Sequence, residues 1–348
     1  MRAVYPKHSA HRFGVGWALI YLEWKECNLR FVRISYAYNQ TMKRVLHKAA
    51  RHLKSYFSND VSAIEFLMGQ SSILVSRSMS DRFEHLWDAE VKVFSQWGED
   101  GILDYLCQAL DISKPKVLEI GAGNFRECNS RFLAENRNAS VFAVDGRDDL
   151  NSEIHQNSLR WKTHIFSMQE WITPKNINNV IKTAQESMSG IDVFSLDLDG
   201  NDFWILDEAN LQGVSIVVVE YNPLFGSKLA VSVPRDDRFD RTTKHFSWLY
   251  YGASLNAFIE TLSQKDFVFI GTNRVGSNGF FVRKSIVNRI KLTIPKDLSL
   301  YVDWRIRESR DQHGKLDYLS KNNRIDLIKD MPLINILDGS EIQVKDLL

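Results

Sequence analysis

The sequence predicts an α/β fold in which a mainly parallel sheet carries helices on both faces. From residue 94 onward, segments with helical spacing of apolar residues alternate with short apolar runs, as expected when helices connect parallel strands. The run at 214–219 (VSIVVV) is apolar on both faces, which is typical of a central strand. Two last runs, at 267–271 and 279–283, flank a loop with Gly, Ser and Asn and indicate an antiparallel hairpin.

The elements follow one another in a regular order. Short apolar runs predict five parallel strands, at 116–120, 140–144, 164–168, 192–198 and 214–219. Helical spacing predicts helices between and after them, at 100–110, 130–136 and 254–263. Thr173 and Pro174 mark a further helix start, because threonine caps helices and proline suits their first turn.

A parallel sheet that ends in an antiparallel hairpin is the arrangement of class I methyltransferases, with strand order 3-2-1-4-5-7-6 and an antiparallel last strand. A dinucleotide-binding fold would continue with a parallel sixth strand instead. We therefore expect a Rossmann-like methyltransferase domain at 94–285. A basic, partly helical extension at 1–90 precedes it, and a C-terminal extension at 286–348 follows it.

Positive charge is concentrated in the N-terminal extension. The first 59 residues contain eleven Lys or Arg against two Glu, although the whole chain carries a net charge of only +1. The segment 42–57 has helical apolar spacing and a basic opposite face, so it can lie on an anionic membrane surface as a peripheral contact. A solvated extension packed on the main domain is the plainer interpretation. Nucleic-acid binding is not expected, because no exposed aromatics interleave with base-reading residues.

Composition and cysteine usage favour a cytoplasmic protein. The apolar run at 14–22 is about half as long as a membrane-spanning helix requires. Glu-Trp-Lys follows this run where a secretory signal would have small residues. The cysteines are far apart and show neither metal nor redox spacing; they are Cys27, Cys107 and Cys128.

A glycine turn between two acidic strand ends predicts a nucleotide-type cofactor. Gly121 and Gly123 close the first strand and let the backbone turn sharply and approach a ligand. The following helix offers N–H groups to a carboxylate. S-adenosylmethionine carries such a carboxylate, an ammonium and a ribose diol. Glu119 is placed to receive the ammonium, directly or through water, and Asp145 to accept both ribose hydroxyls.

Two other interpretations use the same turn. A nicotinamide or flavin site needs glycine or alanine at the sixth position of its fingerprint, where this chain has Arg126, and it has no need of the acid at Glu119. A tight strand–helix turn without any ligand is the structural alternative.

Acidic residues follow the fourth and fifth strands, at the edge where such sheets bind ligands. Asp197 and Asp199 would lie on one face if the fourth strand runs that far. Methyl transfer from a sulfonium needs in-line attack and often a base. We expect Asp199, and then Glu220, to be that base or to orient the acceptor. A turn that these residues merely shape is the alternative, with Asp202 as a helix cap.

Oxygen-rich clusters also suit magnesium or calcium. The spacing is not that of a calcium-binding loop, because Gly200 comes too early and no distal glutamate follows in register. No metal is therefore expected.

The segment 224–251 interrupts the fold after the fifth strand and is rich in Asp, Arg and aromatic residues. We expect it to recognise the acceptor, together with Asp202. His245, Tyr250 and Tyr251 are the side chains expected to stack on a sugar ring, and packing against the domain is the alternative for each.

Several motifs together resemble one family. They are FSQWGEDG at 94–101, VLEIGAGNF at 117–125, FSLDLDGNDFWIL at 194–206, EYNP at 220–223, YYGASL at 250–255, GSNGFFVR at 276–283, RESRD at 307–311 and GKLDYL at 314–319. From residue 94 to the C-terminus the chain resembles FkbM-type methyltransferases, most of all a bacterial subgroup found near glycan-biosynthesis genes.

The resemblance implies S-adenosylmethionine as donor and methylation of an oxygen, often on a sugar or a polyketide. It also implies that the segment 94–101 folds over the donor pocket, which brings Gln96 and Asp100 there. Trp97 stands where the subgroup usually has Asn, and Gly123 where it often has an aromatic or polar residue. The donor contacts at these two positions therefore do not follow from the resemblance.

The sequence thus predicts an S-adenosylmethionine-dependent methyltransferase that acts on a sugar, a glycan or a related small molecule. Two alternatives stay open. One is a binding protein that keeps the fold without catalysis, and the other is a different nucleotide-using enzyme, such as a glycosyltransferase or a dehydrogenase.

Overall fold

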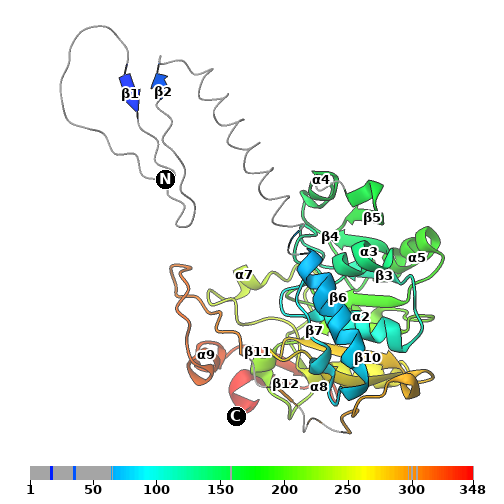
Figure 1. Ribbon diagram of the computed structural model, residues 1–348. Helices are drawn as coiled ribbons and strands as arrows, with labels where there is room; N and C mark the ends of the chain where they lie inside the picture. Colours follow the sequence, from blue (N-terminus) through cyan, green and yellow to red (C-terminus); the bar gives the residue numbers. More distant parts are fainter. Residues whose placement is uncertain are drawn as a thin grey trace. The chain divides into compact units, whose positions relative to one another are not determined.

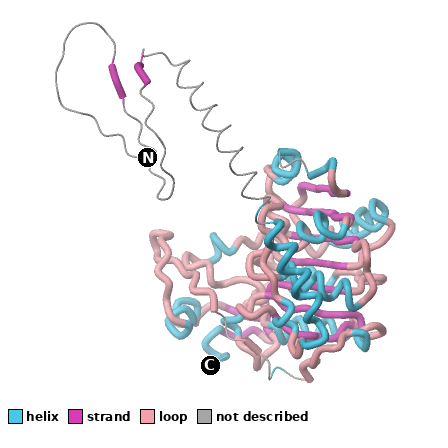
Figure 2. The backbone as a smooth tube through the Cα atoms, in the orientation of Figure 1, coloured by secondary structure: helices cyan, strands magenta, loops and turns pink. Residues whose placement is uncertain are grey.

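The computed structural model describes residues 64, 66–156, 159–296, 298, 301–302 and 305–347, with two short strands nearer the N-terminus (Figures 1 and 2). Its contacts divide the chain into two units, Met1–Glu65 and Phe66–Leu348. In the first unit, β1 (Gly16–Ala18) pairs antiparallel with β2 (Ile34–Tyr36). The segment 42–57, with its predicted amphipathic helix, lies outside the described residues, as does Cys27. Within the described residues, no helix has the length and apolarity needed to cross a membrane.

The second unit is built on a seven-stranded sheet in the order β5-β4-β3-β6-β7-β10-β9. Five parallel strands form most of it: β3 (Lys116–Ile120), β4 (Ser140–Asp145), β5 (His164–Gln169), β6 (Val193–Leu196) and β7 (Ile216–Glu220). β9 (Phe267–Thr272) and β10 (Asn278–Arg283) form a hairpin, and β10 runs antiparallel to both of its neighbours. Numbered within this sheet along the chain, the strands read 3-2-1-4-5-7-6. The predicted class I methyltransferase topology is confirmed.

Helices cover both faces of the sheet (Figure 1). One face packs against α2 (Glu99–Ala109), α3 (Arg131–Arg137) and α4 (Leu150–Gln156), and the other against α5 (Ile177–Met188), α6 (Asp202–Glu208) and α8 (Leu255–Gln264). Because side chains alternate along a strand, Val117 of β3 packs in the first layer and Leu118 in the second. Cys107 and Cys128 are free and buried. The sheet is thus buried on both sides, and only its edges at the strand ends are available for a site.

Two predicted boundaries differ from the structure. The helix expected to start at Thr173 begins at Ile177, and Asn176 is its N-cap. The Asn176 side-chain oxygen accepts a hydrogen bond from the backbone N–H of Thr173 at 2.7 Å, which closes a turn before the helix. The fourth strand, expected to reach residue 198, ends at Leu196. Asp199 has a φ of 55°, a left-handed conformation that an extended strand does not allow.

The insertion after β7 and the C-terminal extension form a second, smaller sheet. β8 (Val231–Ser232) comes from the insertion, and β11 (Pro332–Asn335) and β12 (Glu341–Gln343) come from the extension, in the order β12-β11-β8. The insertion adds the short helix α7 (Arg241–Lys244) and the extension adds α9 (Lys321–Ile328). A separate apolar cluster joins residues of both segments, so each needs the other to bury its apolar side chains.

Candidate functional site

Three carboxylates stand in one row across the carboxyl edge of the sheet. Strand pairing aligns the last residues Val144, Ile120, Leu196 and Val219. The residues that come next in these four strands are Asp145, Gly121, Asp197 and Glu220. Since side chains alternate, this row faces the layer that contains α2 and α3, and so does Glu119 two residues before Gly121. The fold therefore gathers acids from four neighbouring strands at one edge.

Gly121 makes this row possible. Its φ is 87°, and a Cβ atom there would lie only 1.5 Å from the backbone oxygen of Asp197. Any side chain would therefore separate β3 from β6 at the point where the two strands end. Gly123 differs, because a Cβ there would meet no atom within 4 Å. The close approach at Gly121 is thus to the end of β6, while Gly123 leaves space free beside the turn, and the predicted approach of this turn to a ligand stays a prediction.

A cavity of about 600 Å³ opens along the row. Its charged lining residues are Glu127, Asp145, Arg147, Glu170, Asp197 and Asp199. A smaller cavity of about 20 Å³ adjoins it and shares Gln96, Gly121, Glu127 and Asp197 with it. Cavities of the larger size hold small ligands or cofactors. Because acids outnumber bases in the lining, the larger cavity suits a cation or a neutral molecule with many hydroxyls.

Asp145 is fixed by the glycine turn and still faces the larger cavity. One carboxylate oxygen accepts the backbone N–H of Gly123 at 2.7 Å, and the other accepts the N–H of Arg147 at 2.9 Å. Each carboxylate oxygen has two lone pairs, so both retain acceptor capacity for a ligand hydroxyl. Asp145 is therefore preorganised to accept two hydroxyl groups.

Glu119 lies deeper, beside the smaller cavity. Its carboxylate accepts the backbone N–H groups of Asn129 at 2.7 Å and Ser130 at 3.0 Å, and it also bonds the Ser130 hydroxyl. Burial raises the pKa of this carboxyl group, and the bonds from Ser130 and Asn129 oppose the rise. Glu119 and Asp145 thus lie on the same side of the sheet, with the two adjoining cavities between them rather than packed side chains.

The segment 94–101 contributes to the site through Gln96, which lines both cavities. Asp100 does not reach them, contrary to the predicted cofactor contact. It is fully buried, and one of its oxygens accepts the N–H groups of Val93, Phe94 and Ser95 at 2.7–2.8 Å. Asp100 therefore holds the loop that carries Gln96. A neighbour in α2, Glu99, reaches the smaller cavity instead.

Asp197, Asp199 and Glu220 form the acidic centre of the site, with one oxygen of each within 4.8 Å of the others. Burial, followed by the negative charge of Asp199, raises the pKa of Asp197 well above its usual range. Burial and the charge of Asp197 do the same to the pKa of Glu220. Asp197 lines both cavities, whereas Glu220 lines neither and lies next to Asp197. Three carboxylates at this spacing could also hold a cation, so the absence of a metal stays a prediction.

Asp199 reaches the larger cavity from a left-handed backbone position. It does not share a strand face with Asp197 as predicted, because the strand ends before either residue. Its carboxylate pairs with the guanidinium of Arg241, which the insertion supplies. Arg241 is held in turn by the backbone oxygen of Trp248 at 3.1 Å and lies over the Tyr251 ring at 4.4 Å.

Asp202 shapes the turn instead of contacting the acceptor as predicted. It is 1% exposed, and its two oxygens accept the N–H groups of Leu198 at 2.7 Å and Gly200 at 2.8 Å. Burial raises its pKa to about 6. The alternative that the sequence left open, turn chemistry at the start of a helix, is the one that the contacts support.

The aromatic residues expected to stack on a sugar ring lie elsewhere. Tyr250 and Tyr251 are buried in the cluster that joins insertion and extension, and the Tyr250 hydroxyl donates to the backbone oxygen of Pro332 at 2.5 Å. His245 is half-buried, bonds the Ser247 hydroxyl at 2.7 Å and does not line the larger cavity. The predicted stacking is therefore wrong for both tyrosines, since the subdomain needs their rings for its own core.

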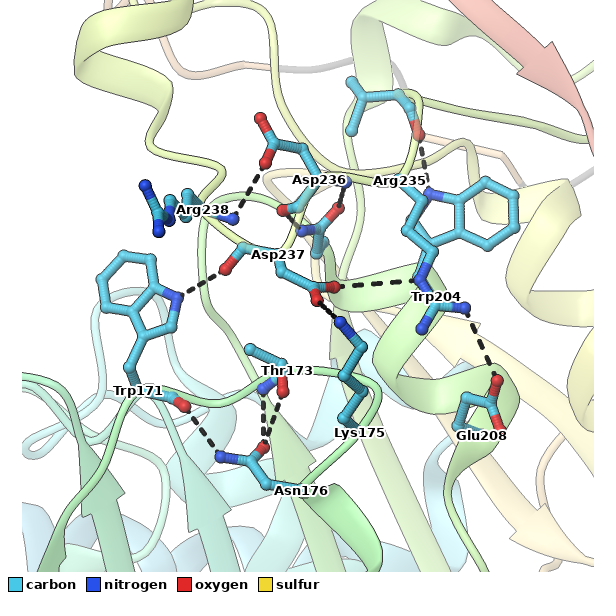
Figure 3. A network of polar contacts seen from close by, with 12 residues as sticks. Trp171, Thr173, Lys175, Asn176, Trp204, Glu208, Arg235, Asp236, Asp237 and Arg238 are labelled. Atoms are coloured by element: carbon cyan, nitrogen blue, oxygen red, sulfur yellow. Dashed lines mark hydrogen bonds and ion pairs between the residues drawn. The ribbon is translucent and has the colours of Figure 1, made fainter.

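Trp171 and Phe239, which line the larger cavity, were not predicted. The Trp171 indole donates to the backbone oxygen of Asp237 at 2.9 Å, and the Asp237 carboxylate pairs with Lys175 at 2.5 Å (Figure 3). This network ties the insertion to the loop after β5. A tryptophan three residues beyond a predicted parallel strand was a usable signal, because it falls at the ligand-binding edge.

Comparisons with known proteins find only distant similarity to solved structures. No protein-family model matches the chain, and no curated protein matches it either. Among solved structures, TehB from Haemophilus influenzae aligns at 16% identity and a TM-score of 0.31, over 51% of this chain and 61% of TehB. An S-adenosylmethionine-dependent methyltransferase from Clostridium acetobutylicum aligns at 10% identity and a TM-score of 0.32, over 52% of this chain and 89% of its own. A putative O-methyltransferase from Klebsiella pneumoniae aligns at 11% identity and a TM-score of 0.30, over 52% and 78%. Likeness of this extent says nothing of the reaction or its substrate.

Proposed function

We propose that this protein is an S-adenosylmethionine-dependent methyltransferase that methylates a hydroxyl oxygen of a sugar, a glycan or a related small molecule. One observation carries the proposal. Asp145, Gly121 and Asp197 stand in register along an open cavity of about 600 Å³ at the carboxyl ends of parallel strands. This edge is where open α/β sheets bind nucleotide cofactors.

The residues present fit the donor at both of its polar ends. Asp145 would accept the ribose hydroxyls with the acceptor capacity that Gly123 and Arg147 leave free. The ammonium would lie toward the smaller cavity, where Glu119, Glu99 and Gln96 provide oxygen acceptors. The acid-rich lining suits a donor that carries a net positive charge.

The apolar part of the cavity lining fits an adenine ring. Trp171 contributes an aromatic face, and Ile172, Leu198 and Ile205 add apolar surface. The hydrogen bond from its indole nitrogen to Asp237 fixes the ring of Trp171 beside Gly146. Stacking on an oriented indole costs little side-chain entropy, so we assign the adenine to this side.

When bound, the donor supplies a methyl group activated by a sulfonium. The acceptor hydroxyl would lie near Asp197 and Asp199, and one of these carboxylates would take its proton as the carbon–oxygen bond forms and the methyl–sulfur bond breaks, with S-adenosylhomocysteine as the leaving group. Asp197 is best placed for this step, since it lines the cavity and its raised pKa strengthens it as a base. Glu220 would lie beside Asp197 without contacting the acceptor, and its negative charge would repel that of Asp197. Arg241 would hold Asp199 in position.

We further propose that the chain is an FkbM-type methyltransferase. The motif positions support this, because several of them meet at one place. Gln96 of FSQWGEDG, Gly121 of VLEIGAGNF and Asp197 of FSLDLDGNDFWIL all line the larger cavity. Glu220 of EYNP stands in the same row as Asp197.

Isothermal titration calorimetry on the full chain tests the proposed donor. We expect saturable binding of S-adenosylmethionine and S-adenosylhomocysteine, and no binding of NAD⁺ or UDP-glucose at the same concentration. Binding of NAD⁺ or UDP-glucose alone would overturn the assignment in favour of another nucleotide-using enzyme. Failure of all four ligands to bind the folded protein would also contradict it.

A further inference from the structure

The hairpin of β9 and β10 extends the row of polar residues at the carboxyl edge of the sheet. Asn278, the first residue of β10, pairs directly with Glu220 of β7. Residues that lie opposite each other in an antiparallel pair point to the same side of the sheet. The side chain of Asn278 therefore lies on the side that carries Glu220 and Asp197, and Asn278 lines the smaller cavity. It belongs to the motif GSNGFFVR, to which the proposed function assigns no role.

The amide of Asn278 is oriented by a carboxylate. Its Nδ2 donates to Oε1 of Glu99 at 3.0 Å, and the amide oxygen cannot take that place, because a carboxylate offers no proton to it. Oδ1 therefore points away from Glu99. This oxygen is buried and has no hydrogen-bond partner among the described residues, and Asn278 as a whole is 7% exposed. A buried acceptor without a donor is costly, so Oδ1 indicates a ligand or a water molecule that donates to it.

The charge around Oδ1 indicates which kind of ligand fits. Among the described residues, the lining of the smaller cavity contains no Lys or Arg, and its acids are Glu99, Glu119, Glu127 and Asp197. Glu99 and Glu119 are almost fully buried, and each already accepts backbone N–H groups at 2.7–3.0 Å. The volume of about 20 Å³ admits a group of the size of one water molecule. A small cation that donates hydrogen bonds fits this cavity, whereas a carboxylate does not.

We propose that Oδ1 of Asn278 accepts a hydrogen bond from the ammonium group of the methyl donor, which enters the smaller cavity. The inference rests on the proposed function, because the ligand is the donor itself. An ammonium group has three N–H donors and no acceptor, so it matches a cavity that offers acceptors. Gln96 lines both cavities and provides a second amide, and the charges of Glu99 and Glu119 compensate the ammonium. Asp197 is then left to the acceptor hydroxyl.

This role makes Asn278 a residue that selects the ligand. A nucleoside without an ammonium group leaves Oδ1 unpartnered, and a site built to bond a polar group rejects an analogue that lacks it. The hairpin therefore reads the amino-acid end of the donor, while Asp145, at the other end of the row, would bind the ribose.

Calorimetry of the full chain with three related ligands tests this role. S-adenosylhomocysteine carries the ammonium group, its deaminated analogue lacks only that group, and 5′-methylthioadenosine lacks the whole amino-acid part. Wild type should bind the deaminated analogue about tenfold more weakly than S-adenosylhomocysteine, because a hydrogen bond from a charged group is lost. Asn278→Leu should weaken binding of S-adenosylhomocysteine by about tenfold for the same reason. It should leave the affinity for 5′-methylthioadenosine unchanged.

Thr272→Val is the matched control. Thr272 lies in the same hairpin and is 1% exposed, and its Oγ1 is also buried without a partner among the described residues. It lines neither the larger nor the smaller cavity. The control variant should therefore bind S-adenosylhomocysteine and 5′-methylthioadenosine as wild type does. Circular dichroism establishes that each variant is folded.

Three results would overturn the proposal. Equal weakening of both ligands by Asn278→Leu would show that Asn278 only supports the fold of the site. Wild-type affinity of this variant for S-adenosylhomocysteine would show that Oδ1 bonds a water molecule only. If the variant does not fold, the wild type decides: equal affinities for S-adenosylhomocysteine and its deaminated analogue would exclude the ammonium from this cavity. Failure of the wild type to bind any of the three ligands would contradict the proposed function itself, and this inference with it.

Discussion

The carboxyl groups of Asp197 and Glu220 follow the ends of two neighbouring parallel strands, with oxygen atoms within 4.8 Å of each other. Each is partly buried, and the pKa of each is raised. Two acids at this distance cannot both ionise at neutral pH without a large electrostatic cost. The pair therefore retains one proton where isolated carboxylates have lost theirs, and its ionised member is a stronger base than an isolated carboxylate.

This pair makes stability depend on pH. Because folding raises both pKa values, the native state binds these protons more tightly than the unfolded chain does. The resulting stabilisation is complete below the ordinary carboxyl pKa and is lost as the pH rises through the raised folded values. Glu220→Gln removes one titrating acid and its repulsion of Asp197. We expect urea denaturation from about pH 5 to about pH 8 to show a smaller loss of stability for this variant than for wild type.

The exposed Glu186 provides a control for that series, since its side chain is 68% exposed. Glu186→Gln should follow the wild-type dependence on pH. If Glu220→Gln follows it as well, the pair does not titrate as described.

Gly121 and Gly123 should respond very differently to alanine. Gly121→Ala drives a methyl group into the backbone oxygen of Asp197, so we expect a loss of more than about 4 kcal/mol or no folded protein. Gly123→Ala meets no neighbouring atom and should cost only the left-handed backbone strain, about 1 kcal/mol. Chemical denaturation of both variants measures the difference. Equal losses would show that β3 and β6 do not approach as closely as described.

Asp104 should be a major contributor to stability. It is buried and pairs with Arg77 and Arg137, both at 2.7 Å, which joins the helix of residues 66–79 to α2 and α3. Asp104→Ala leaves two guanidinium groups without their partner, so we expect a loss of about 3 kcal/mol in the free energy of unfolding. Glu186→Ala, which breaks an exposed ion pair, should cost less than about 0.5 kcal/mol. Similar costs for the two would rule out this role for Asp104.

Trp171 should contribute to donor affinity by stacking. Trp171→Ala is expected to weaken binding of S-adenosylhomocysteine by about tenfold, because stacking of a base on an aromatic ring contributes roughly 1–3 kcal/mol. Trp161→Ala is the control, since Trp161 is exposed and does not line the cavity. If calorimetry finds the same affinity for S-adenosylhomocysteine in both variants, the adenine does not stack on Trp171.

The sheet could be predicted from the sequence, because its strands are short apolar runs separated by helical periods. The hairpin of β9 and β10 followed from local turn chemistry and distinguished the topology from a dinucleotide-binding fold. Glu119, Gly121, Asp145 and Asp197 could be placed for a related reason, since carboxyl ends of parallel strands must meet at one edge.

The structure of the insertion could not be predicted, because its core is formed with residues of the C-terminal extension that are distant in the sequence. Tyr250 and Tyr251 resemble exposed ligand-stacking residues until the C-terminal extension packs on them. Arg241 reaches Asp199 only through the fold of that subdomain. Asp100 and Asp202 were expected to contact ligands. In the structure their carboxylates accept backbone N–H groups of neighbouring loop residues, and the sequence alone does not show this.

The central claim is that Asp145 holds the ribose of the methyl donor, and calorimetric titration of Asp145→Asn with S-adenosylhomocysteine tests it most directly. The matched control is Asp148→Asn, an exposed acid in the same loop. We expect Asp145→Asn to lose at least about tenfold in affinity, because a neutral amide replaces the charged carboxylate that would accept the ribose hydroxyls. Asp148→Asn should bind as wild type does. Wild-type affinity in a folded Asp145→Asn variant would contradict the proposed site.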